Sequence, residues 1–264
     1  MKFLIWIGAI ALGLYVLAIA AVYFGQRKLL YFPPNVYLSP SAMNVPMEEI
    51  KNKEGEIVSW WSPPQKETAK TVMVFHGNGS AVYSNHDIFR DLINAGHGVL
   101  SVGYPGYPGR RGNPNQEDII EAARSQYDWV RAQGIQAENI VFYGSSLGTG
   151  VAAQLTQYAE PALLFVDAPF NSILDMAKRT VRFAPVSLLM KDQYRSDLAL
   201  KGKSIPLIWT HGTRDIVVPL SQGQKLFDNY EGPKTAHIIQ NGEHSNLWAL
   251  GGRDITLKAL EALE

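Results

Sequence analysis

A serine flanked by glycines is the residue in this sequence best suited to nucleophilic chemistry. Gly144 to Gly148 reads Gly-Ser-Ser-Leu-Gly, so Ser146 is the central serine of a GxSxG pattern. The apolar run over 140–143 predicts a buried strand, and the composition of 147–158 predicts a helix. A turn between such a strand and helix exposes the serine hydroxyl and directs the helix N-terminus at developing negative charge. The pattern therefore favours a nucleophilic role for Ser146.

A serine nucleophile needs a base within hydrogen-bonding reach, and three of the six histidines in the sequence follow predicted strands. Strand ends matter because active sites in parallel sheets form beyond the carboxyl ends of the strands. His244 follows the last predicted strand and can reach back over Ser146, so we predict it as the base. His76 and His211 are each followed by glycine at a strand end, and we interpret them as structural residues that hold loops.

Two aspartates compete for the position that orients this base. Asp215 lies four residues after His211 in a Gly-Thr-Arg-Asp loop, which gives its carboxylate room to reach the imidazole. Asp167 ends another strand but is followed by Ala-Pro. We therefore predict Asp215 as the acid and assign Asp167 to the orientation of neighbouring loops. The resulting chain order of serine, acid and histidine is the order that this kind of sheet imposes.

Composition narrows the classes of function. The chain has 264 residues, 46% of them hydrophobic, which suffices for one large α/β domain or two small ones. Acidic and basic residues balance at 24 each without a basic run, which argues against a nucleic-acid partner. The sequence has no cysteine, which excludes a thiol nucleophile and thiolate metal ligands. We expect neither a metal ion nor a cofactor, because no HExxH-like ligand spacing occurs.

The amino-terminal segment predicts a membrane anchor. The residues from Phe3 to Gly25 carry no charge and are long enough to cross the hydrocarbon core as a helix, with Arg27 and Lys28 as a basic end. The alternative is a cleaved signal peptide, since Ala18-Ile19-Ala20 offers a cleavage pattern. We favour an uncleaved anchor over 1–28, with the side of the membrane left open.

The rest of the chain predicts an α/β domain over 47–264, joined to the anchor by a Pro-rich connector over 29–46. A polar hairpin opens the domain at a sheet edge, and strands then alternate with helices, which predicts parallel pairing. The expected strands are 47–53, 56–61, 71–75, 98–102, 140–143, 162–166, 206–210 and 235–239. The expected helices are 82–94, 116–133, 147–158, 221–229 and one from 254.

A helical segment at about 170–203 interrupts this alternation, and we predict that it forms a small cap over the site. The cap mixes apolar side chains with basic ones. A basic amphipathic helix beside an anchored domain can rest on anionic lipid, but we interpret these charges as solvated.

Four motifs together resemble the α/β-hydrolase superfamily, and they span the domain in the expected order. They are Phe-His-Gly-Asn-Gly at 75–79, Gly-Ser-Ser-Leu-Gly at 144–148, His-Gly-Thr-Arg-Asp at 211–215 followed by Val-Val-Pro at 217–219, and Gly-Glu-His at 242–244. Gln-Arg-Lys-Leu-Leu-Tyr-Phe-Pro at 26–33 extends the resemblance to the membrane-anchored Bem46-like group of serine hydrolases.

The resemblance implies the α/β-hydrolase fold, a mostly parallel sheet flanked by helices, and a set of site residues. It implies Ser146 as nucleophile, Asp215 as acid and His244 as base. The backbone N–H groups of Asn78 and Leu147 would form the oxyanion hole, and no role is implied for the Asn78 side chain. The segment 103–108 departs from the group, because Gly-Tyr-Pro-Gly-Tyr-Pro stands where an Asp-Tyr-Arg-Gly-Tyr-Gly loop is typical.

These features predict a membrane-anchored serine esterase or acyl hydrolase that cleaves an ester or thioester through an acyl-enzyme. A lipid-like acyl compound is the expected substrate. A serine peptidase remains an alternative because the same triad serves amides. A non-catalytic hydrolase-like module that binds a membrane partner is a second alternative.

Overall fold

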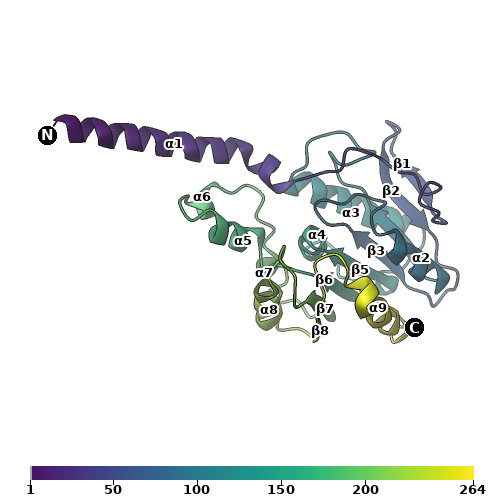
Figure 1. Ribbon diagram of the computed structural model, residues 1–264. Helices are drawn as coiled ribbons and strands as arrows, with labels where there is room; N and C mark the ends of the chain where they lie inside the picture. The colour runs from purple at the N-terminus through teal and green to yellow at the C-terminus, as the bar shows by residue number, and fades with distance from the viewer. Residues whose placement is uncertain (1) are drawn as a thin grey trace.

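The apolar strands of this sequence form one mostly parallel sheet. The computed structural model describes residues 2–264, and within them eight strands pair in the order β1-β2-β4-β3-β5-β6-β7-β8 (Figure 1). β1 and β2 pair antiparallel with their neighbours, and all pairs from β4 to β8 are parallel. The strands are β1 (Glu48–Lys51), β2 (Ile57–Ser62), β3 (Thr71–Phe75), β4 (Gly98–Val102), β5 (Ile140–Ser145), β6 (Leu163–Asp167), β7 (Leu207–Gly212) and β8 (Lys234–Ile239).

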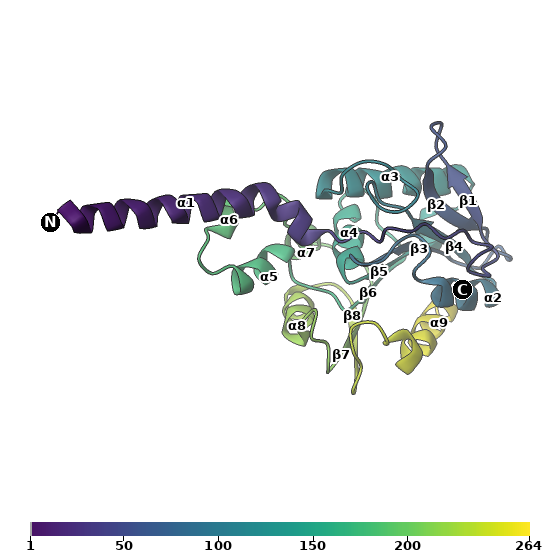
Figure 2. The same cartoon turned by 45° about the horizontal axis from the view of Figure 1, so that its top comes forward.

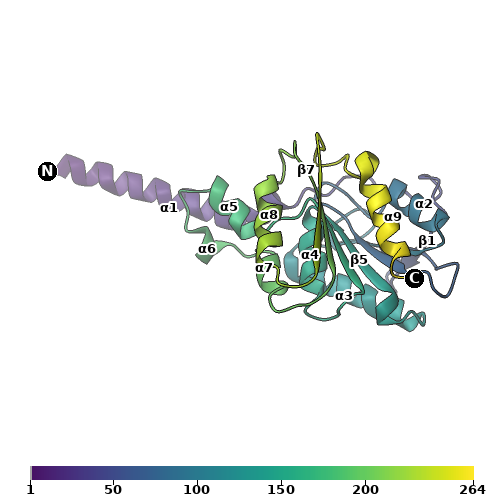
Figure 3. The ribbon, with the colours of Figure 1, turned by 90° about the horizontal axis from the view of Figure 1, so that it is seen from below.

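Helices cover both faces of the sheet because the inner strands are apolar on both sides. α2 (His86–Asn94) and α9 (Arg253–Glu261) pack on one face. α3 (Gln116–Ala132), α4 (Leu147–Leu155), α7 (Ser196–Ala199) and α8 (Leu220–Asn229) pack on the other. Figure 3 shows α9 and α2 on the opposite side of the sheet from α4 and α8. Each face thus has its own hydrophobic core, and the polar carboxyl ends of the strands remain available for a site.

The amino-terminal helix α1 (Lys2–Leu30) projects away from the domain, and none of its residues is buried. It is apolar and long enough to cross a membrane. α5 (Ile173–Thr180) and α6 (Val186–Leu189), which belong to the predicted cap, lie beside the C-terminal half of α1 (Figures 1 and 2). The Tyr15 hydroxyl donates a hydrogen bond to the Phe183 carbonyl oxygen at 3.0 Å. α1 and the predicted cap are therefore in direct contact.

Most element boundaries fall within two residues of the expected ones, and the larger differences have local causes. α1 continues to Leu30, two residues into the expected connector, and ends before the prolines. α2 begins four residues late because Ser84 closes a turn, with its hydroxyl accepting the Ala81 N–H at 2.8 Å. α4 ends at Leu155, where the chain continues in tighter turns closed by bonds between residues three apart.

The close approach of α4 to the sheet depends on glycine. A Cβ atom at Gly148 would clash with the backbone carbonyl of Phe75, and one at Gly144 would lie 2.6 Å from the Gly148 carbonyl oxygen. These contacts involve main-chain atoms, which cannot move aside as a side chain can. The two glycines of the GxSxG pattern are therefore required sterically.

Replacing Gly148 with alanine should reduce the free energy of unfolding by about 3 kcal/mol or more, because a methyl group must displace the Phe75 backbone. Denaturant titration of the detergent-solubilised protein measures this loss. Gly79→Ala is the matched control, since a Cβ there would meet nothing within 4 Å. Equal unfolding midpoints for the two variants would contradict the packing argument.

Candidate active site

Ser146 sits on a strained turn between β5 and α4. Its backbone has φ 51° and ψ −118°, a conformation that non-glycine residues rarely adopt. Hydrogen bonds hold it there: the Ser146 N–H donates to the Asp167 carbonyl at 2.9 Å, and the Thr149 N–H and hydroxyl both donate to the Ser146 carbonyl. The predicted strand-to-helix turn is therefore present, and the backbone directs the serine side chain out of the sheet.

Ser146, His244 and Asp215 form a continuous hydrogen-bonded chain. The Ser146 Oγ lies 2.9 Å from His244 Nε2, and His244 Nδ1 lies 2.7 Å from Asp215 Oδ2. These residues come from three separate loops after β5, β7 and β8, and the parallel order of those strands brings them together. Both distances suit transfer of a proton from the serine to the imidazole.

The Asp215 carboxylate is fixed and buried, with no exposed side-chain surface. Its Oδ1 accepts the N–H groups of Val217 and Val218 at 2.8 and 2.9 Å. Burial by itself would raise the pKa of Asp215, but hydrogen bonds from His211, His244 and the Val218 backbone outweigh it and hold the pKa well below its usual range. Asp215 is therefore ionised at neutral pH and accepts the hydrogen bond from His244 Nδ1.

His211 and His76 are buried structural histidines, as the sequence indicates. His211 Nδ1 accepts the Trp209 indole N–H at 3.2 Å, and its Nε2 lies 2.9 Å from the Val218 carbonyl oxygen. His211 Nε2 is therefore the donor to Val218. His76 stacks on Tyr104 with ring centroids 3.9 Å apart, and burial lowers its pKa to about 4. Both rings therefore hold loops around the site.

Asp167 contacts neither Ser146 Oγ nor the His244 ring. Its Oδ1 accepts the Thr210 hydroxyl at 2.6 Å, and the Tyr143 hydroxyl donates to its Oδ2 at 3.4 Å. It therefore links β5, β6 and β7 below the site, which agrees with the predicted orienting role. Burial raises its pKa to about 6, although the bond from Thr210 opposes the change.

The raised pKa of Asp167 means that the folded protein favours the neutral carboxyl. Its contribution to the free energy of unfolding is complete below pH 3.8, the ordinary pKa, and is lost as pH rises through about 6. The change in pKa from 3.8 to about 6 corresponds to about 3 kcal/mol. Asp167→Asn should therefore gain stability relative to the wild type from about pH 4 to about pH 7. Denaturant titrations across this range measure the difference between the two proteins, and a constant difference would contradict the assignment.

The two predicted oxyanion donors lie beside Ser146. Asn78 follows β3 and Leu147 opens α4, and both line the same cavity as the serine. Neither backbone N–H has a hydrogen-bond acceptor within residues 2–264. Free N–H groups at a helix N-terminus next to a nucleophile are suited to stabilising an oxyanion.

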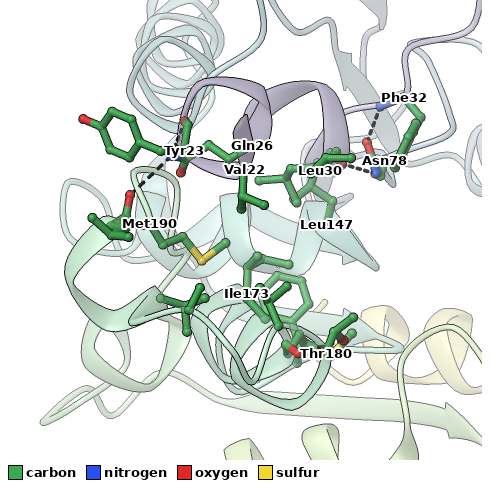
Figure 4. A pocket seen from close by; sticks show the side chains of 18 of the residues that line it. Val22, Tyr23, Gln26, Leu30, Phe32, Asn78, Leu147, Ile173, Thr180 and Met190 are labelled. Atoms are coloured by element: carbon green, nitrogen blue, oxygen red, sulfur yellow. Dashed lines mark hydrogen bonds between the residues drawn. The ribbon is translucent and has the colours of Figure 1, made fainter. Parts of the chain in front are cut away.

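The side chain of Asn78 has a structural task that the sequence did not indicate. Its amide nitrogen donates to the Leu30 carbonyl, and its oxygen accepts the Phe32 N–H at 2.9 Å. The Tyr107 hydroxyl donates to the same oxygen at 3.0 Å. The expectation that only the backbone of Asn78 matters is therefore incomplete, because its side chain ties the end of α1 to the predicted oxyanion loop (Figure 4).

The unusual loop at 103–108 supports this arrangement. The buried Tyr104 hydroxyl donates to the His76 carbonyl at 3.1 Å, while Tyr107 reaches Asn78 as described. The two tyrosine rings also contact each other edge to face. Gly103 and Pro105 stand where the typical loop has its charged pair, whereas both tyrosines of that loop are kept and brace the loop carrying Asn78.

Asn78→Ala should slow covalent labelling of Ser146 by a fluorophosphonate about tenfold, because three hydrogen bonds worth about 1 kcal/mol each no longer position the loop. The second-order labelling rate measures the effect. Tyr107→Phe removes one of the three bonds and should give a smaller change in the same direction. Labelling of Asn78→Ala at the wild-type rate would show that the side chain has no positioning role.

An apolar cavity of about 490 Å³ extends from the serine (Figure 4). Its floor consists of Asn78, Ser146, Leu147, Phe170, Val217 and Val218, and its walls are α1 on one side and the segment from α5 to α6 on the other. Such a cavity fits an apolar group attached to the reacting carbon. Within residues 2–264, His, Asp and Glu side chains form no group of three or more that could hold a metal ion.

Comparisons with known proteins agree with this fold. No protein-family model matches the chain. It is 25% identical over 241 residues to the uncharacterized protein MT2364 of Mycobacterium tuberculosis, covering 89% of this chain and 86% of that protein. It is 27% identical over 221 residues to the lysophosphatidylserine lipase ABHD12 of Macaca fascicularis, covering 73% of this chain and 55% of the lipase.

Solved structures extend the likeness to three dimensions. The Pyrococcus furiosus esterase Pf2001 superposes with a TM-score of 0.66 at 18% identity, over 89% of this chain and 97% of the esterase. This likeness shows the fold, and the finer resemblance to the Bem46-like group remains a prediction. The eight-stranded sheet and this superposition show the α/β-hydrolase fold, and the likeness to a lipase and an esterase supports an ester hydrolase.

Proposed function

We propose that this protein is a membrane-anchored serine hydrolase that cleaves an ester or thioester of an apolar acyl group. The observation that carries the proposal is the hydrogen-bonded chain of Ser146, His244 and Asp215 at the floor of an apolar cavity. We assign Ser146 as nucleophile, His244 as base and Asp215 as acid.

In the acylation step, the Ser146 Oγ attacks the carbonyl carbon while its proton passes to His244 Nε2. The Asp215 carboxylate accepts the Nδ1 proton as a hydrogen bond and stabilises the imidazolium. The carbonyl oxygen becomes an oxyanion, which the backbone N–H groups of Asn78 and Leu147 stabilise. Collapse of this intermediate breaks the bond to the leaving group, which takes the proton from His244 Nε2 as an alcohol or thiol.

Water completes the reaction. A water molecule gives a proton to neutral His244 as its oxygen attacks the acyl-serine carbonyl. When the second tetrahedral intermediate collapses, His244 returns that proton to the Ser146 Oγ. The products are a carboxylic acid and the free enzyme, and the protons balance without any further group.

An ester or thioester substrate fits the site better than a peptide. The cavity walls contributed by α1, α5 and α6 are almost entirely apolar, so they can bury an alkyl chain but offer few partners for the N–H and C=O groups of a peptide backbone. The similarity of this chain to a lysophosphatidylserine lipase and to a Pyrococcus esterase also supports ester hydrolysis. A peptidase with the same triad is therefore disfavoured.

The anchoring part of the proposal is supported by α1. Its side chains are exposed from residue 2 to residue 18, including Phe3, Trp6 and Leu17, which suits contact with lipid rather than with a protein core. Removal of residues 1–20 as a signal peptide would delete Tyr15, which bonds to the cap, and Ile19, which lines the cavity. We therefore propose that α1 is retained as a membrane-spanning anchor.

Ser146→Ala should abolish ester hydrolysis and fluorophosphonate labelling, because no other group replaces the attacking oxygen. Turnover of a nitrophenyl ester and gel fluorescence of the labelled protein measure the two effects. Ser145→Ala is the matched control, since its side chain takes no part in the hydrogen-bonded chain. Retention of either activity in Ser146→Ala would refute the assignment.

A further inference from the structure

We propose that the C-terminal half of α1 is itself a wall of the acyl-binding site, so that the substrate is a membrane lipid whose acyl chain enters from the bilayer between α1 and the cap. This inference rests on the proposed function and adds the source of the substrate and the residues that select its chain length. The helix would thus serve both as anchor and as part of the site.

One face of α1 lines the cavity. The six contributing residues follow helical spacing, which places their side chains in a single row: Ile19, Val22, Tyr23, Gln26, Leu29 and Leu30. Ala21 and Phe24, which belong to another face of the helix, are exposed and do not line the cavity. The helix therefore contributes a defined surface to the site.

The cap supplies the facing wall. Its apolar side chains come from α5, from α6 and from the residues between and just after these helices, and they include Ile173, Met176, Val181, Val186, Leu189 and Met190. Figure 4 shows Val22 of α1 facing Ile173 and Met190 across the cavity. An alkyl chain held here would be covered by apolar side chains on both sides, and each buried methylene contributes about 0.8 kcal/mol.

Most of this wall fits within one leaflet of a bilayer. The seven steps from Ile19 to Gln26 rise by about 10.5 Å at 1.5 Å per residue. The hydrocarbon core is about 30 Å thick, so one leaflet contributes about 15 Å. With Arg27 and Lys28 at the membrane surface, Ile19 to Gln26 lie within the leaflet next to the domain. A lipid acyl chain in that leaflet is therefore already at the depth of the cavity.

Specific contacts hold this wall in place. The Arg27 guanidinium donates to both carboxylate oxygens of Asp192, at 2.9 and 3.3 Å, and Asp192 is nearly buried. The Gln26 side chain donates to the Leu189 carbonyl at 3.3 Å and accepts the Lys191 N–H at 2.7 Å. α1 is thus fixed against the cap by polar groups next to the apolar wall, as a binding-site wall needs to be.

The tip of the cap reaches the membrane side of the cavity. Phe183 and Leu188 are 55% and 84% exposed, although both are large and apolar. The Phe183 carbonyl accepts the hydroxyl of Tyr15, one helical turn beyond Ile19, so this tip lies at bilayer depth beside the span. Exposed apolar side chains at that position suit contact with lipid. The mouth of the cavity therefore opens where lipid is present.

The test compares Val22→Trp with Ala21→Trp in the full-length protein in detergent micelles. Val22→Trp fills the cavity, and it should lower kcat/KM for a nitrophenyl palmitate at least tenfold while leaving that for the butyrate within about twofold. Ala21→Trp places the same side chain on another face of the same helix and should change neither value. If Val22→Trp lowered kcat/KM equally for both esters, or for neither, the inference would be overturned.

A second variant tests the same wall without introducing a larger side chain. Val22→Ala enlarges the cavity and should raise kcat/KM for palmitate relative to butyrate, and an unchanged ratio would count against the proposal. Fluorophosphonate labelling of each variant reports an intact Ser146. If wild-type turnover did not depend on Ser146, the proposed function would fail, whereas Ser146-dependent turnover with an unaltered chain-length profile would refute this inference alone.

Discussion

The close approach of α4 to the sheet is the constraint on which the active site depends. Gly144 and Gly148 allow main-chain atoms of the helix and of two strands to touch, and the strained backbone of Ser146 follows from that contact. The strain has a use, because it points the hydroxyl outward and leaves the Leu147 N–H without an acceptor in the described chain. His244 and Asp215 then need only to come from the neighbouring strand ends, which the parallel sheet places at the same edge.

A second set of contacts connects this edge to the amino-terminal helix. Asn78 carries a predicted oxyanion donor on its backbone and bonds with its side chain to Leu30 and Phe32. Asp192 accepts both Arg27 of α1 and the backbone N–H of Gln116 at the start of α3. The helix is therefore joined to the oxyanion loop, to the cap and to a core helix, and its apolar face completes the cavity. The amino-terminal helix and the α/β domain therefore form one structure rather than two parts joined by a linker.

Much of this could be predicted from sequence because the relevant signals are local. The GxSxG turn, the strand-to-helix alternation and histidines after strands are short patterns, and they led to Ser146, His244 and Asp215, which the structure brings into hydrogen-bond contact. The Asn78 side-chain bonds and the cavity wall on α1 join residues far apart in the chain, and no local pattern encodes them. The spacing of Ile19, Val22, Tyr23 and Gln26 was a usable signal, but an apolar span hides it because the residues between these four are also apolar.

The ion pair between Arg27 and Asp192 has a practical meaning for work on this protein. Anchored enzymes are commonly shortened to obtain a soluble domain. Here a cut after the basic pair would leave the Asp192 carboxylate without its guanidinium partner in a nearly closed site, and it would open one side of the cavity to water. The shortened domain would keep its sheet and its serine but would present a shallow groove. The substrate preference measured on the shortened domain would then reflect binding in this groove, and it would not report binding in the cavity that α1 completes.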